Sequence, residues 1–164
     1  MTKANASLLF NSPIETGVRS LSILVSGYPE SFDLDRLVEM DYLVVHSGDI
    51  GGPESLHTPL PHRSGELLVR RGLIESGLTL MMSRGLVQLL VRSDGFRYVA
   101  SDLAAPFLAS MTTAYFRRLM ERADWASLRF SSVATEEIRR ITRGLMEGWT
   151  SQFEALKNTE QSHD

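Results

Sequence analysis

The Ser93-Asp94-Gly95 turn limits the fold more than any other feature of the chain. It separates two short, mostly apolar segments, LVQLLV at residues 86–91 and FRYVA at residues 96–100. An Asp-Gly pair between two such segments is typical of a β-hairpin, because its tight turn needs a residue that accepts positive φ angles. The sequence therefore predicts an antiparallel hairpin over residues 86–100.

A helix is predicted near the start of the chain, directly after a capping box. Ser12 takes the N-cap position, Pro13 the first helical position, and Glu15 reaches back to the N-cap backbone. One apolar face recurs at helical spacing and comprises Ile14, Val18, Leu21 and Val25. The Gly-Tyr-Pro sequence at 27–29 ends this helix.

Two further helices are predicted before the hairpin, over residues 33–46 and 65–83. Their inward faces comprise Leu34, Leu37, Val38, Tyr42 and Val45, and then Leu67, Ile74, Leu78 and Met81. Asp41 falls beside the first of these faces, as either a surface acid or a buried acid paired with an arginine. Gly72 and Gly77 either weaken their helix or let another backbone approach closely.

The order of three helices and a hairpin indicates a winged-helix-like core. Helical patterns follow near residues 102–130 and 135–157. We therefore expect an α+β, mostly α fold, with one winged-helix-like domain and its C-terminal helical extension over residues 1–158 and a disordered tail at 159–164. A length of 164 residues with 43% hydrophobic residues suits one globular domain.

Composition excludes several classes of function. The chain has no cysteine, which rules out disulfides, thiolate zinc sites and cysteine nucleophiles. The sequence shows neither a signal peptide nor a run of the ~18 apolar residues that a membrane span needs, so we expect a cytoplasmic protein. Net charge is −3, with −5 over residues 1–62 and +3 over residues 63–97, which argues against a dominant non-specific nucleic-acid binder.

The segment from His46 to Arg71, HSGDIGGPESLHTPLPHRSGELLVRR, holds three of the four histidines of the chain. Its glycines and prolines prevent a regular element between the second and third helices. The resulting connection has about 18 residues, and loops of that length in compact domains are usually functional. The segment is therefore the first place to look for a site.

The residue types of this segment occur in metal sites, in catalytic triads and in phosphate-binding loops. His46, His57 and His62 lack the spacing of known zinc motifs, and Asp49 is the nearby acid. Ser47 lies next to His46, but neighbouring residues rarely reach the geometry of a catalytic triad. The GDIGGP sequence lacks the lysine of a phosphate-binding loop and does not follow a strand. We expect no catalytic, metal or cofactor-binding residue, and no enzyme activity.

A winged-helix DNA-binding regulator is the alternative function. The third helix and the hairpin offer four arginines as nucleic-acid contacts: Arg70, Arg71, Arg92 and Arg97. Acidic residues share the helix, and the whole chain is acidic, so any binding by the isolated protein is expected to be weak and salt-sensitive.

The chain resembles the middle component of bacterial ABC-three-component systems, including the accessory subunit of Lamassu-type anti-phage defence. The resemblance rests on LLFNSPIETGVRSL, FDLDRLVEMDYLVVHSGDIGGPESLHTPLPHRSGELLVRRGLIESGL and DGFRYVASDLAAPFLAS, and covers residues 8–130. The most specific motif is D-Y-x-x-x-H-S-G-D-x-G-G-P-x-S-L-H-x-x-x-P-x-R-x-G-E-L from Asp41 to Leu67. His62 departs from it, because asparagine is expected before Arg63.

The resemblance implies a subunit without catalytic residues that sits with an SMC/Rad50-like ABC ATPase and an effector, often a nuclease. The charge of −5 over residues 1–62 favours a protein partner with a basic surface. Four residues in or near the glycine-rich segment are expected to order the loop: Asp41, His46, Asp49 and Arg63. Four more are expected at its exposed tip, as contacts to the partner: Glu54, Ser55, Leu56 and His57.

Overall fold

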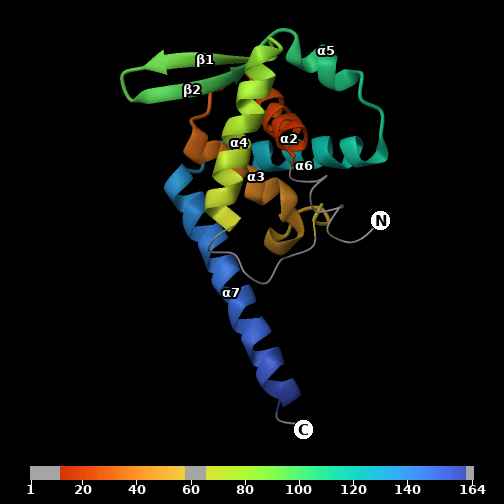
Figure 1. The fold of residues 1–164 in the computed structure, drawn as a ribbon, viewed down its shortest axis with the longest axis vertical. Helices are drawn as coiled ribbons and strands as arrows, with labels where there is room; N and C mark the ends of the chain where they lie inside the picture. The colour runs from red at the N-terminus through yellow and green to blue at the C-terminus, as the bar shows by residue number, and fades with distance from the viewer. Residues whose placement is uncertain (1–11, 58–65, 162–164) are drawn as a thin grey trace.

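The computed structural model describes residues 12–57 and 66–161, which form a group of packed helices with a two-stranded sheet at its edge (Figure 1). In chain order the elements are α2 (Pro13–Ser26), α3 (Leu34–Val45), the 3₁₀ helix η1 (Ser47–Ile50), α4 (Glu66–Ser83), β1 (Val87–Arg92), β2 (Gly95–Ala100), α5 (Ala104–Ala109), α6 (Ala114–Phe130) and α7 (Thr135–Gln161).

The predicted α+β, mostly α fold is confirmed, with three helices followed by a hairpin in an order consistent with a winged-helix-like arrangement. β1 and β2 pair antiparallel from Val87 opposite Ala100 to Arg92 opposite Gly95. Gly95 has a φ of 125°, a backbone conformation that residues other than glycine rarely adopt. The Ser-Asp-Gly turn thus sits where the sequence placed it.

Helix starts also follow the sequence closely. The Ser12 hydroxyl accepts a hydrogen bond of 3.2 Å from the Glu15 amide, and Asp33 caps α3 in the same way through the Arg36 amide at 2.8 Å. Each cap satisfies a backbone donor that the first helical turn leaves unpaired. These local bonds explain why the bounds of α2 and α3 were predictable.

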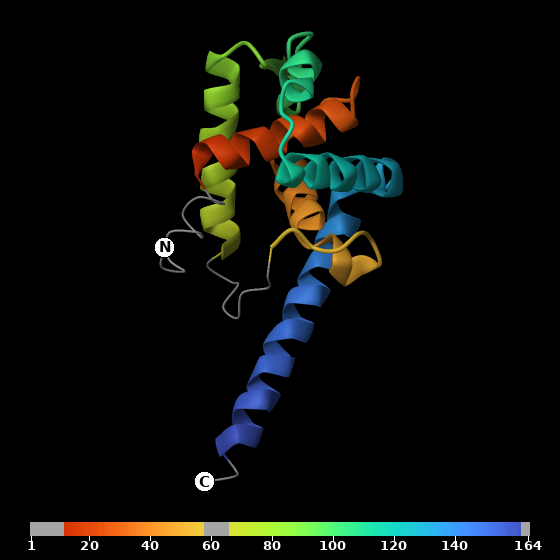
Figure 2. The same cartoon turned by 90° about the vertical axis from the view of Figure 1, so that its right-hand side faces the viewer.

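The core lies where α2 packs against α4 and α6, and where α3 packs against α4, α6 and α7. Figure 2 shows α2 crossing α4 on one side and lying along α6 on the other. The side chains at its centre are almost inaccessible to water: Leu21, Leu24, Leu37, Leu43, Ile74, Leu78, Leu119 and Ile138. Burial of these apolar faces is what holds the helices together.

α2 and α4 approach most closely at two glycines. A Cβ atom placed on Gly77 would lie 2.5 Å from the Gly17 amide nitrogen, too close for any real contact. Of the two alternatives for Gly77, close backbone approach is therefore the correct one. No described atom lies within 4 Å of a Cβ placed on Gly72, so that glycine has no such role.

Three details differ from the sequence expectations. The helical pattern over 102–130 is two helices, α5 and α6, because the Thr113 hydroxyl accepts from the Phe116 amide and starts a new helix. Ile14, expected to face inward, is 65% exposed, since periodicity does not tell how far the covering helices reach. α7 continues to Gln161, so residues 159–161 are helical rather than part of a disordered tail.

The N-terminal part of α7 is hydrogen-bonded to α3. Glu39 of α3, itself buried, accepts from Arg139 Nε at 3.1 Å and from the Thr142 hydroxyl at 2.8 Å. The second half of α7 extends away from the other elements (Figures 1 and 2). None of the helices among the described residues combines the length and the apolar character that crossing a membrane would need.

The two glycines of α4 generate opposite predictions. Gly77→Ala should destabilise the protein by about 1–3 kcal/mol, because its methyl group would collide with the α2 backbone. Gly72→Ala should stabilise the protein by about 0.5–1 kcal/mol, because the added methyl group meets no other side chain or helix among the described residues and alanine has the better helix propensity. Urea unfolding of both variants measures the difference. Equal stabilities would mean that α2 and α4 do not touch at this point.

Candidate functional site

Asp41 is the first residue of the sequence motif, and its side chain is completely buried. Its carboxylate oxygens accept from Arg19 Nε at 2.8 Å, from Arg19 Nη2 at 3.2 Å and from Arg70 Nη1 at 2.5 Å. Burial by itself raises the pKa of Asp41, but the two guanidinium groups outweigh burial and bring the pKa to about 2. Asp41 is thus ionised at every pH at which the fold is normally stable.

The three charged groups come from three different helices. Arg19 lies on α2, Asp41 on α3 and Arg70 on α4. Of the two alternatives for Asp41, a surface acid or a buried acid paired with an arginine, the second is therefore correct. It was expected to order the glycine-rich loop, and the structure shows instead that it ties the helices together.

A second cluster joins the loop to the helices. The Tyr115 hydroxyl on α6 hydrogen-bonds to the Glu15 side chain on α2 and lies 3.3 Å from His57 Nε2. Burial, with a contribution from the charge of Arg19, lowers the pKa of His57 to about 4. Burial and the bond to Glu15 raise the pKa of Tyr115 well above its usual value. Both rings are neutral near pH 7 and act as hydrogen-bonding groups.

The glycine-rich segment closes on itself through its own polar groups. The Ser47 hydroxyl donates to the Pro53 carbonyl at 2.8 Å, and the Ser55 hydroxyl accepts from the Gly48 amide at 3.0 Å. The Leu56 amide then returns to the Val45 carbonyl at 2.9 Å. The serines therefore fix the loop conformation, and Ser47 is engaged with a carbonyl rather than poised as a nucleophile.

Two α6 residues hold this loop against the body of the protein. Arg122, only 4% exposed, donates to the Glu54 carbonyl at 2.6 Å and to the Arg118 carbonyl at 2.8 Å. Gly52 packs so closely on the Trp125 indole that a Cβ atom there would lie 2.4 Å from the ring. Sequence reasoning missed both residues, because nothing local links positions about 70 residues apart.

The expected exposed tip is folded inward. The Glu54 residue is exposed, but Ser55 is partly buried, Leu56 packs against the hydrophobic core and His57 faces Tyr115. The expected exposure is therefore wrong for Ser55, Leu56 and His57, whereas the role of these residues as partner contacts stays a prediction. The anchors on α6 are the physical reason, because they pull the segment onto the helix.

Three other residues were expected to order the loop: His46, Asp49 and Arg63. His46 is buried at the C-terminus of α3, with its ring centroid 4.7 Å from that of Tyr42. The Asp49 amide donates to the His46 carbonyl, but Asp49 Oδ2 is buried without a hydrogen-bond partner. Arg63, the expected anchor, and His62 lie outside the described residues. Among residues 12–57 and 66–161, no cluster of histidine and acid side chains could hold a metal ion.

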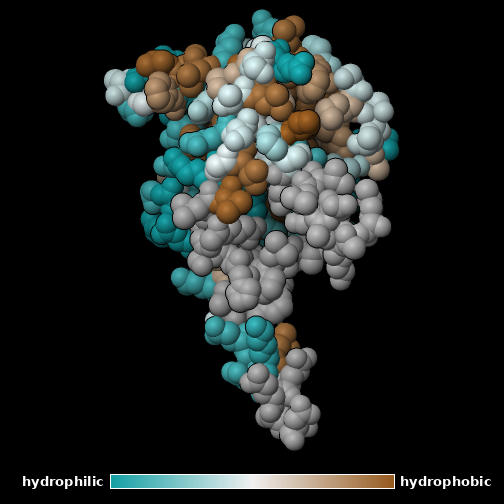
Figure 3. All heavy atoms as spheres, in the orientation of Figure 1, coloured by the Kyte–Doolittle hydropathy of each residue, from teal (hydrophilic) through white to brown (hydrophobic). Residues whose placement is uncertain are grey.

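The arginines expected to face nucleic acid are mostly engaged elsewhere. Arg70 is 8% exposed and paired with Asp41, Arg71 pairs with Asp35, and Arg97 donates to the Ser31 hydroxyl and carbonyl. The hairpin that carries Arg92 presents an apolar face, visible in Figure 3, which contains Leu89, Val91 and Phe96. This arrangement offers phosphate groups little positive charge.

Comparison with known protein families identifies a match over most of the chain. The model of the family described as "ABC-three component (ABC-3C) system Middle Component 2" matches residues 9–152, which is most of the chain. No curated protein matches the chain, and no solved structure does.

Removal of the buried charge tests the first cluster. Asp41→Asn should destabilise the protein by about 3–5 kcal/mol, because it leaves two buried guanidinium groups without a counter-charge. Asp35→Asn, on the exposed side of the same helix, should cost less than about 1 kcal/mol. Urea unfolding at pH 7 compares the two. Similar losses would show that Arg19 and Arg70 do not depend on Asp41.

Lowering the pH should reduce the stability of the wild-type protein, because Asp41 becomes protonated. The pKa of Asp41 is about 2 in the folded protein and about 4 in an unfolded chain. Its contribution to stability is therefore complete above about pH 4 and is lost as the pH falls toward 2. Asp41→Asn lacks this contribution, so its unfolding free energy should fall less steeply over that interval.

The contact of Arg122 with the loop is tested by hydrogen exchange. Arg122→Ala removes the donor to the Glu54 carbonyl, so the Gly52 and Leu56 amides should exchange roughly tenfold faster or more. Arg118→Ala, an exposed change on the same helix, should leave those amides unaffected. Unchanged protection in Arg122→Ala would mean that the loop is ordered by its internal bonds alone.

Proposed function

The chain belongs to the Middle Component 2 family of ABC-three-component systems, and we propose that it is their non-catalytic accessory subunit. In this proposal it binds an SMC/Rad50-like ABC ATPase and its effector in a bacterial anti-phage defence complex of the Lamassu type. The chain acts by association, and the reactions of the complex take place on the other two components.

The observation that carries this proposal is the use of the motif residues within the fold. Asp41 joins three helices, Ser47 and Ser55 bond loop backbone, and His57 is held neutral against Tyr115. Acid, serine and histidine side chains that carry out chemistry must reach a substrate, whereas these groups bond to protein. The motif thus maintains the shape of a surface.

The shape of the chain also suits a connecting subunit. The body of packed helices carries a rigid loop on one side, and the second half of α7 reaches beyond the body (Figure 2). Two separate surfaces on one small domain allow simultaneous contact with two partners. A single-partner regulator needs no such extension.

Co-purification tests the proposal directly. The tagged full-length chain, co-expressed with the ATPase and effector components of its three-component system, should elute with them as one complex in gel filtration. The isolated chain should hydrolyse no ATP and cleave no DNA. Elution of the chain alone, under conditions in which the other two components are folded, would contradict the proposal.

DNA titration separates the proposal from the regulator alternative. The isolated chain should bind duplex DNA more weakly than ~10⁻⁶ M at physiological salt, because Arg70, Arg71 and Arg97 are engaged within the fold. A specific regulator would bind its site at ~10⁻⁸ M or tighter. Binding at that strength would favour the alternative.

A further inference from the structure

A surface groove lies between the turn after α2 and the C-terminal part of α6. It has a volume of 510 Å³, and its walls include Tyr28, Glu30, Asp124, Ser127 and Leu128. The groove lies away from the glycine-rich motif, so neither the motif residues nor the clusters around Asp41 and Tyr115 line it. Its residues have no assigned role in the fold beyond the turn itself.

The rim of the groove carries two large side chains that water reaches freely. Leu128 is 85% exposed, the largest value among the exposed hydrophobic residues of the described chain, and Tyr28 is 59% exposed. A pair of exposed apolar groups beside a hollow is the arrangement that protein interfaces use to seat a partner side chain.

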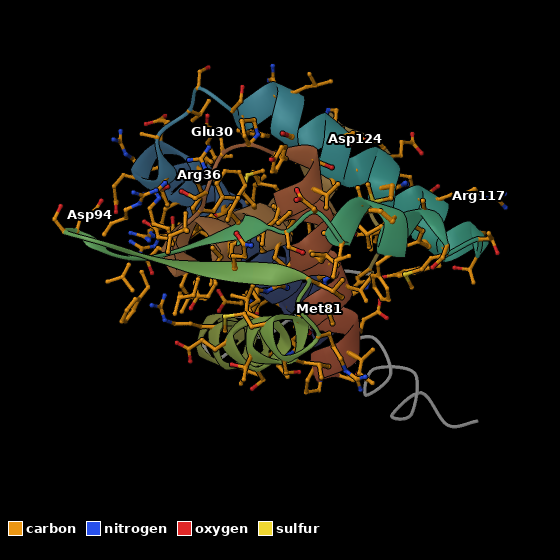
Figure 4. All side chains as sticks on the ribbon, turned by 90° about the horizontal axis from the view of Figure 1, so that it is seen from above. Glu30, Arg36, Met81, Asp94, Arg117 and Asp124 are labelled. Atoms are coloured by element: carbon orange, nitrogen blue, oxygen red, sulfur yellow. The ribbon has the colours of Figure 1, made fainter. Side chains whose placement is uncertain are left out.

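The walls of the groove are negative. Glu30 and Asp124 lie on the same side of the molecule, flanking the end of α2 (Figure 4). Asp124 accepts from the Ser26 hydroxyl at 2.7 Å, and within the described residues neither acid forms a salt bridge. The last turn of α2 also lacks a basic residue, so its carbonyl ends add partial negative charge.

Three arginines near the groove bond to groups other than these acids, and the first of them, Arg97, donates to the Ser31 hydroxyl and carbonyl. Arg36 donates to the Phe130 and Val133 carbonyls, and Arg129 lies over the Phe130 ring. The groove is thus a hollow with apolar rims and two carboxylates that lack a charged partner. Phosphate groups would be repelled by it, which excludes nucleic acid as the occupant.

We propose that this groove binds a basic, apolar segment of another component of the complex. A leucine, methionine or aromatic side chain of that segment sits between Tyr28 and Leu128, and a neighbouring arginine or lysine pairs with Glu30 and Asp124. The inference rests on the proposed function, because it identifies the chemistry of the partner that the accessory subunit recognises.

A second copy of the chain fits the groove less well. A two-fold interface places the same patch of both copies face to face. The Glu30 and Asp124 carboxylates of the two copies would then share one interface, where their like charges repel each other. A basic partner meets no such repulsion.

Matched substitutions test the groove in the full-length chain co-expressed with the ATPase and effector components. Leu128→Asp and Glu30→Lys should each weaken the complex by roughly tenfold or more. Ile14→Asp, at the opposite end of α2, and Glu75→Lys, on the exposed face of α4, make the same chemical changes elsewhere and should leave affinity unchanged. The Glu30→Lys complex should also lose its dependence on salt.

All four substituted residues are exposed, so each variant should melt at the wild-type temperature. Capture of a component by the wild type and equally by Leu128→Asp and Glu30→Lys would overturn the groove and leave the proposed function intact. Failure of the wild type to capture either component would overturn the proposed function itself. Wild-type self-association that Leu128→Asp abolishes would identify a second copy as the occupant and contradict the basic partner.

Discussion

The buried Asp41 carboxylate, held between Arg19 and Arg70, is the interaction on which the arrangement of the helices depends. Each of its partners comes from a different helix, and none of the three charges could stay in the interior without the others. The close crossing of α2 and α4 at Gly17 and Gly77 brings the two arginine-bearing helices together, so that both guanidinium groups reach one acid. Packing of small residues and pairing of charges are therefore two parts of the same contact.

Residues 46–57 of the glycine-rich segment are bonded to the helices and to each other. Its serines close the loop, Arg122 and Tyr115 attach it to α6, and Gly52 lets it lie flat on the Trp125 ring. The same polar residue types that suggest catalysis in a sequence here satisfy backbone groups and each other. The described residues also form two features outside this segment, the acidic groove beside Tyr28 and the projecting half of α7, and the first of them is where we propose that a partner binds.

The errors in the site predictions share one cause, which is that contacts between distant parts of the chain cannot be derived from local sequence. The tip at 54–57 was expected to be exposed, but it is attached to α6 through Arg122 and Tyr115, which lie far along the chain. Arg70 was expected to contact nucleic acid from the third helix. Its actual partner, Asp41, lies 29 residues earlier in the chain, so local sequence does not indicate the pairing. Asp41 could be given two roles from its helical position, and only its neighbours in space select one of them.

The sequence by itself determined the order of the first three helices and the hairpin, the starts of α2 and α3, and the family to which the chain belongs. Caps such as Ser12 and Asp33, the Asp-Gly turn and helical periodicity act over a few residues, so their consequences can be derived from local spacing. The tertiary structure alone decided which charges are buried, which loop residues face inward and where a hollow remains on the surface. Those outcomes depend on how α2, α4 and α6 pack, because the energy of a charge or an apolar side chain is set by the groups around it in space.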